Sequence, residues 1–227
     1  MTSLWFEGNN EAYEVITTWK PKSDVWAYLY GPAILSSSTA ISAGYINYRF
    51  RKALKLRSFV FITTYIATTC IPATLASLLH GDFVLAPSLS GKPVCPLCLE
   101  TRSIVLQTTC STLYPLLLAP IVCFQFADRY MTAVIPPLWP EPKLLLKKYL
   151  SIVKPMSRNI CILTAFNIAL GAGIAYGQHM NLVKVSEELQ RMEATLTPER
   201  RDHLKQRSER EDNSVMRGAR PKWPWQE

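Results

Sequence analysis

Charged side chains are missing from four long apolar stretches of this 227-residue chain. No Asp, Glu, Lys, Arg or His lies in Trp26–Tyr48, Phe59–Leu79, Ile104–Phe126 or Ile160–Tyr176. A core helix of a water-soluble protein usually keeps a polar face, so this absence argues against a soluble helical protein. About 20 apolar residues in a helix cross the hydrocarbon layer of a bilayer. The sequence therefore predicts an all-α membrane protein with four transmembrane helices, over about 26–48, 59–79, 104–126 and 160–182.

Ionisable residues at membrane depth and internal repeats are also missing, and both are typical of carriers and pumps. The chain holds no GxSxG, HExxH, P-loop or GxGxxG motif, each of which marks a class of catalytic or nucleotide-binding site. We therefore expect no enzymatic activity, no cofactor, no metal and no small-molecule substrate. A small transporter or channel-like protein remains an alternative.

A signal peptide and a basic, acid-poor presequence are missing from the N-terminus. The first 25 residues hold four acidic and two basic side chains, whereas both kinds of targeting segment are basic. We expect the targeting information to lie in the spans and in their basic flanks.

The formal charge of +8 is concentrated in two connections. Residues 49–57 hold five basic and no acidic side chains, and residues 127–159 hold six against two. Connection 80–102 holds two of each. Because short basic connections stay on the cytoplasm-like side of a membrane, four spans would place both termini and 80–102 on the opposite side. This distribution favours membrane lipids over nucleic acid as the partner. The residues expected to set the topology are Arg49, Arg51, Lys52, Lys55, Arg57, Lys147 and Lys148.

Three parts of the chain follow from this pattern: an acidic N-terminal segment (1–25), the transmembrane domain (26–182) and a charged, partly helical C-terminal extension (183–227). Residues 136–155 alternate leucines with lysines between prolines. They predict a short interfacial helix between spans three and four, or a helix docked on a partner.

Small residues recur at every fourth position of the first and fourth spans. Such stripes allow close approach of membrane helices, so we expect the two spans to pack through them and to offer grooves to partner helices. Substituting leucine for Gly44 or Gly173 should then weaken partner binding without unfolding the protein. The stripes consist of Ser36, Ala40 and Gly44, and of Ala165, Ala169, Gly173 and Gly177.

Cys95 and Cys98 form a C-x-x-C motif in connection 80–102. The pair could form a disulfide, stay as free thiols, bind a metal with His80 as a third ligand, or carry out redox chemistry. The predicted side of the membrane permits oxidation, and a membrane redox protein using this pair is the alternative function.

The order and spacing of several short motifs resemble the transmembrane protein 126 family. The resemblance covers about residues 26–180 and is strongest over 95–136. Its residues include Asn47, Phe50, Arg51, Lys52, Leu54, Cys95, Cys98, Arg102, Ser103, Tyr114, Pro115, Ala127, Arg129, Tyr130, Ala133, Pro136, Lys154, Pro155 and Arg158.

This resemblance implies a multi-pass protein of the mitochondrial inner membrane. Family members act as assembly factors for respiratory complex I, so the implied partners are membrane-arm subunits of that complex and other assembly factors. The family has no established catalytic residues. Under this assignment the basic connections lie in the matrix, and the termini and the Cys95–Cys98 pair lie in the intermembrane space. The extension 183–227 departs from the vertebrate pattern, which ends sooner after the last span.

Overall fold

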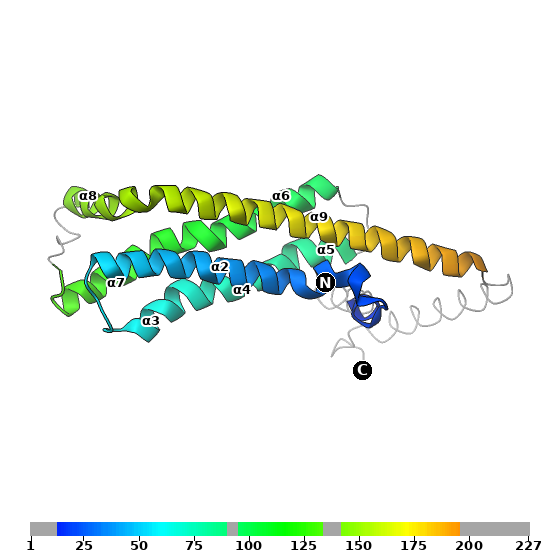
Figure 1. The fold of residues 1–227 in the computed structure, drawn as a ribbon, viewed down its shortest axis with the longest axis horizontal. Coiled ribbons are helices and arrows are strands. Elements are labelled where there is room, and N and C mark those ends of the chain that lie inside the picture. The colour runs from blue at the N-terminus through cyan, green and yellow to red at the C-terminus, as the bar shows by residue number, and fades with distance from the viewer. Residues whose placement is uncertain (1–12, 90–94, 134–141, 196–227) are drawn as a thin grey trace, which may run out of the picture. The chain divides into compact units, whose positions relative to one another are not determined.

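The computed structural model describes residues 13–89, 95–133 and 142–195, and every regular element in these ranges is helical. Four long helical stretches dominate (Figure 1). The first is α2 (Trp26–Ala53), which follows the 3-10 turn η1 (Lys22–Val25). The second joins α3 (Phe61–Tyr65), η2 (Ile66–Cys70), α4 (Ile71–His80), η3 (Gly81–Leu85) and α5 (Ala86–Leu89). The third joins α6 (Pro96–Thr108), η4 (Thr109–Leu113) and α7 (Tyr114–Arg129). Last come α8 (Pro142–Val153), η5 (Lys154–Met156) and α9 (Ser157–Thr195).

Three of these stretches are long and apolar enough to cross a membrane: Phe61–Leu89, Pro96–Arg129 and Lys143–Met192. The all-helical, multi-pass character predicted from sequence is thus confirmed. Helix α2 is not among the three, because serine, threonine and asparagine side chains lower its hydropathy. Several of these polar side chains, including Ser38, Thr39 and Ser42, are buried inside the protein.

The helices run further than the predicted spans. The second stretch continues ten residues past Leu79 to Leu89 and therefore contains His80. The third begins at Pro96, so Cys98 lies in a helix and not in a loop. His80 therefore lies within a candidate membrane-spanning stretch, where its ring finds a hydrogen-bond partner on a distant helix.

Three π-helical turns interrupt the second and third stretches, and each ends two residues before a proline. Turns η2, η3 and η4 precede Pro72, Pro87 and Pro115. A proline lacks an N–H and clashes with the carbonyl four residues earlier. A wider turn relieves that clash, which explains why the helical stretches continue through these prolines. Pro120 lies inside α7.

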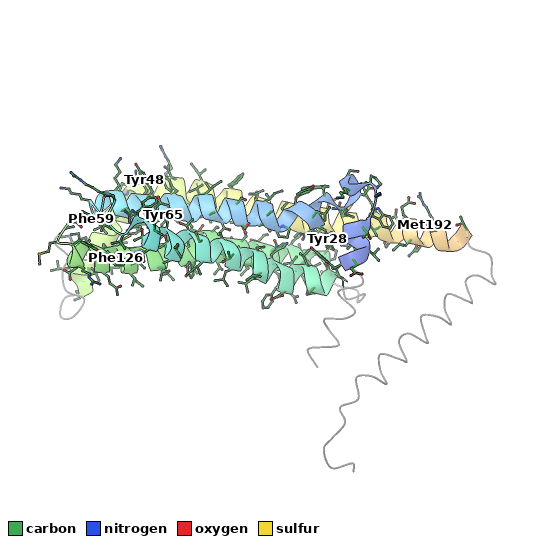
Figure 2. The ribbon with its side chains drawn as sticks, turned by 90° about the horizontal axis from the view of Figure 1, so that it is seen from below. Tyr28, Tyr48, Phe59, Tyr65, Phe126 and Met192 are labelled. Atoms are coloured by element: carbon green, nitrogen blue, oxygen red, sulfur yellow. The ribbon has the colours of Figure 1, made fainter. Side chains whose placement is uncertain are left out.

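The helices of residues 13–182 pack in alternating directions. The C-terminal ends of α2 and α7 lie at the same end as α8, whereas the start of α2 lies at the end where α6 begins (Figure 1). Tyr48, Phe59 and Phe126 mark the first of these ends, and Tyr28 marks the other (Figure 2). Both basic connections therefore leave the helices at one end, which we call the basic end.

An apolar cluster fills the basic end. Phe50 packs edge-on against Phe124, with ring centroids 6.5 Å apart, and stacks on Tyr149 of α8 at 5.9 Å. Leu145, Ile152 and Val153 of α8 pack against the same cluster. Helix α8 thus forms where the interfacial helix was predicted, and its apolar side docks on this chain's own helices. The buried members are Ile46, Phe50, Leu54, Leu56, Ala119, Cys123, Phe124, Ala127, Met156 and Ile160.

The contacts divide the chain into two units, residues 1–182 and 183–227. In the second unit the described residues, 183–195, continue α9 and carry an exposed ion pair between Glu188 and Arg191 at 3.0 Å. Residues 1–12 of the predicted acidic segment and 196–227 of the predicted extension lie outside the described residues.

Candidate functional site

Amide side chains join α2, α6 and α9 in the interior. The Nε2 of Gln107 donates to Oδ1 of Asn167 at 2.8 Å and lies 3.1 Å from the Leu35 carbonyl and from the Thr39 hydroxyl. Asn167 also accepts from Ser38 at 2.9 Å and donates to Ser42 at 2.8 Å. Such bonds hold membrane helices together where lipid offers no competing partner. We call Ser38, Thr39, Ser42, Gln107 and Asn167 the amide network.

A second buried contact joins the helices nearer the start of α2. The ring Nε2 of His80 lies 3.1 Å from Oε1 of Gln178, and Nε2 of Gln178 donates to the Ala27 carbonyl at 3.1 Å. Gly31 permits this approach, because a Cβ there would lie 2.8 Å from Ile174 and 2.9 Å from Gln178. The ring of His80 is therefore hydrogen-bonded to an amide side chain. Within the described residues 13–89, 95–133 and 142–195, no group of three His, Cys, Asp or Glu side chains could hold a metal ion.

The two predicted stripes of small residues do not meet. A Cβ on Gly44 would lie 3.8 Å from Thr69 and 3.9 Å from Tyr65, so this glycine faces the second helical stretch. Ala165, Ala169 and Gly173 are exposed, and a Cβ on Gly173 would meet nothing within 4 Å. Ser36 and Ala40 are half-buried, and Gly177 faces Ala27 and Trp26.

The predicted contact through these stripes therefore holds at Gly177 and is wrong for Ala165, Ala169 and Gly173. Helices α2 and α9 do pack, but through Gly31, the amide network and Gln178, because hydrogen-bonding side chains turn those faces inward. The small residues of α9 are left on an outward face with Ile162 and Tyr176. We call Ile162, Ala165, Ala169, Gly173 and Tyr176 the outward face of α9.

Arg51 belongs to the interior, unlike the other basic residues expected to set the topology. Its side chain is buried and donates to the Thr64 hydroxyl at 2.7 Å and to the carbonyls of Arg57 and Phe59 at 2.5 and 3.1 Å. It also lies over the Phe61 ring at 5.2 Å. The loop that it binds holds Lys55, Arg57 and Val60 with positive φ angles of 53°, 45° and 51°. Such angles are unfavourable, most of all for a β-branched valine, so Arg51 stabilises a strained turn.

Several residues of the family resemblance pack around the same turn and the π-helical turn η4. Tyr130 stacks on Phe59 with ring centroids 5.2 Å apart, so the end of α7 packs against the loop between α2 and α3. Tyr114 is half-buried and Pro115 is buried directly after η4, while Arg102 and Arg129 are exposed. These positions give Tyr130 and Tyr114 a packing role.

Cys95 and Cys98 are exposed free thiols, so the candidate disulfide is not formed in this structure. Cys95 is the N-cap residue of α6, and its carbonyl accepts from the Cys98 N–H at 3.0 Å. The backbone N–H of Cys98, followed by its thiol, lowers the pKa of Cys95 below its ordinary value. A helix N-terminus stabilises a thiolate in this way.

Three other topology residues, Arg49, Lys52 and Lys148, line one groove at the basic end. Lys55, Arg57 and Lys147 are exposed elsewhere at that end.

The amide network and the His80–Gln178 contact were not predicted from the sequence, because the spans were assessed by their lack of charged side chains. Their signal was visible, since Gln107 and Asn167 are two of only four amides in the apolar stretches, with Asn47 and Gln125.

Comparison with known proteins supports one family. The family model described as Transmembrane protein 126 matches residues 11–192. Transmembrane protein 126 of Drosophila melanogaster is 31% identical over 196 residues, which is 84% of this chain and 87% of that protein. Transmembrane protein 126A of Rattus norvegicus is 27% identical over 164 residues, covering 72% of this chain and 81% of that protein. No solved structure matches.

Proposed function

Because this chain belongs to the transmembrane protein 126 family, we propose that it is a non-enzymatic assembly factor for the membrane arm of mitochondrial respiratory complex I. It would reside in the inner membrane and hold immature hydrophobic subunits through helix packing until the next module docks. Membrane-arm subunits and other assembly factors are its proposed partners.

The observation that carries this proposal is the outward face of α9. Ala165, Ala169 and Gly173 are exposed on a helix whose opposite side is occupied by Asn167 and Gln178. Small residues let a second helix approach closely, and such packing drives association in lipid without a hydrophobic effect. Ile162 and Tyr176 border these residues and would contribute contact area to a docked subunit.

Four crossings are part of the proposal. Helix α2 has 28 residues and so measures about 42 Å, longer than the hydrocarbon layer of about 30 Å. It packs against α4 and α7, and its polar side chains bond to α6 and α9. With one side packed against the candidate spans, α2 can cross the membrane despite its low hydropathy, because Ser38, Thr39 and Ser42 find hydrogen-bond partners within the protein.

Substitution on the outward face of α9 tests the proposal. Ala169→Leu with Gly173→Leu places two large side chains on the outward face of α9. We therefore expect the amount of mature complex I to fall and membrane-arm intermediates to accumulate on native gels. Complexome profiling of the tagged protein should show loss of comigrating subunits. Ala33→Leu is the matched control, because Ala33 is a small exposed residue on α2. A normal intermediate profile in the double variant, with normal protein abundance, contradicts the proposal.

A redox function is the second candidate, favoured by the lowered pKa of Cys95 at a helix N-terminus. Because the lowered pKa leaves more thiolate at a given pH, alkylation of Cys95 should reach half its maximal rate at lower pH than alkylation of glutathione. Cys98→Ser keeps the backbone N–H and should retain much of this difference.

Joint replacement of Cys95 and Cys98 by serine separates the two candidates. Unchanged complex I content leaves the packing function intact and contradicts a redox role. Loss of a dithiol–disulfide exchange activity with a client protein would support the redox role.

A further inference from the structure

We propose that the groove at the basic end binds the phosphate headgroup of an anionic phospholipid. Helix α2 contributes Arg49 and Lys52 to this groove, and α8 contributes Lys148 and Ser151. We call these four residues and the space between them the basic groove. The inference uses one part of the proposed function, the position of this end at the membrane surface, and does not depend on complex I.

The basic groove has the size and chemistry of an anion site. Its volume is about 430 Å³, within the range of small-molecule pockets, about 300–1,000 Å³. Arg49, Lys52 and Lys148 supply three cationic groups, and Ser151 supplies a hydroxyl that donates to the Lys148 carbonyl at 2.7 Å. Among the described residues, no acidic side chain lines the groove. Phosphate oxygens accept hydrogen bonds from the three cationic side chains, and guanidinium can donate with two N–H groups at once.

The fold brings these charges together and keeps them together. Arg49 and Lys52 are one turn apart on α2, and Lys148 and Ser151 are one turn apart on α8, so each pair shares a helix face. The stacking of Phe50 on Tyr149 at 5.9 Å holds the two helices beside each other.

The surroundings of the groove favour a lipid over a soluble phosphate. Exposed apolar side chains occur on both helices that form it: Tyr48 on α2, and Leu144 and Leu150 on α8. Lys52 Nζ lies 6.0 Å from the centroid of the Tyr48 ring. A phospholipid places its phosphate beside its acyl chains, and this arrangement matches cations beside apolar surface. Basic pockets between membrane helices on the positive side are typical headgroup sites.

Because three cations can share two phosphate charges, we expect diphosphatidylglycerol to bind more tightly than phosphatidylglycerol, and phosphatidylcholine to bind weakest. Native mass spectrometry of the purified full chain in detergent, with each lipid added in turn, measures this order. The groove variant replaces Arg49, Lys52 and Lys148 by glutamine. The matched control replaces Arg57, Lys55 and Lys147 by glutamine, which removes the same charge outside the groove.

We expect the groove variant to bind diphosphatidylglycerol at least about tenfold more weakly than the wild type, and the control to stay within about twofold. Equal weakening of both variants would indicate diffuse surface attraction and overturn the proposal. Equal binding of glycerophosphate or inorganic phosphate would assign the groove to a soluble anion and overturn the lipid assignment. If the triple variant does not fold, the same comparison uses the single variants Lys52→Gln in the groove and Lys55→Gln outside it, since both side chains are exposed. Weaker binding of diphosphatidylglycerol by Lys52→Gln than by Lys55→Gln then supports the proposal, and equal binding overturns it. Complex I is absent from this experiment, so its outcome is independent of the assembly role.

Discussion

Arg49 and Arg51 are two residues apart and have different structural roles. Arg49 lines the basic groove, whereas Arg51 points inward and binds the loop that joins α2 to α3. A planar guanidinium can donate in several directions at once, and a lysine cannot reproduce that fork. The side-chain geometry, and not the charge alone, therefore stabilises the strained turn over Lys55–Val60.

Arg51→Lys should lower the free energy of unfolding by about 1.5–3 kcal/mol, the usual range for a hydrogen bond to a charged group. Unfolding of the purified protein in detergent by increasing sodium dodecyl sulfate measures this change. Arg49→Lys is the control with the same chemical change, and we expect its effect to stay within about 0.5 kcal/mol. Equal effects of the two substitutions would show that charge, and not the fork, matters at Arg51.

The buried amides show how single polar residues organise a membrane interior. Asn167 alone engages Ser38, Ser42 and Gln107, and thereby orients α9 against two other helices. In hydrocarbon an unsatisfied amide is costly, so these groups have one arrangement that satisfies them and few alternatives.

Helix α9 differs between its two sides. Gly171 faces inward, where a Cβ would lie 3.3 Å from the Ser103 carbonyl oxygen and 3.4 Å from the Ile104 Cα. Gly173 faces open space two residues later. One helix thus combines a side closed by its own chain with a side available to a partner.

Gly171→Leu should destabilise the protein by about 1–3 kcal/mol, because the new side chain meets the backbone of α6. Gly173→Leu should leave stability within about 0.5 kcal/mol, because nothing lies near its Cβ. The two variants can be compared by the same detergent-unfolding assay. Destabilisation by Gly173→Leu as large as that by Gly171→Leu would contradict the assignment of the two sides.

The second and third helical stretches share another device, the π-helical turn before a proline. Without such turns, Pro72, Pro87 and Pro115 would each break a helix that must stay continuous. Continuity past Leu79 also brings His80 to Gln178, a residue 98 positions later.

For the whole molecule, the separation of charge matches the direction of the helices. The five basic residues of 49–57 and the lysines of α8 lie at one end, and Cys95 precedes α6 at the other (Figure 1). If all four long helices cross the membrane, these ends face different compartments.

Labelling with a membrane-impermeant maleimide tests this topology. Under the proposed inner-membrane location, native Cys95, and Lys20→Cys in a Cys95→Ser, Cys98→Ser background, should react in mitochondria in which only the outer membrane is opened. Ser58→Cys in the same background should react only after the inner membrane is permeabilised. Lys20 and Ser58 are exposed and flank α2. Reaction of both introduced cysteines from one side would mean that α2 does not cross, and three spans would then remain.

The amino-acid sequence predicts that this chain is helical, that it belongs in a membrane and that its basic charge lies in two connections, because length, apolarity and charge act locally. Which side of each helix faces inward depends on how the helices pack. In lipid an apolar side chain is as favourable outside as inside, so the small-residue stripes did not indicate the contact. Hydrogen-bonding partners did: Gln107, Asn167 and Gln178 bond to residues 60 to 151 positions away on other helices. Arg51 and the basic groove follow the same logic, because their partners and neighbours come from separate helices that only packing brings together.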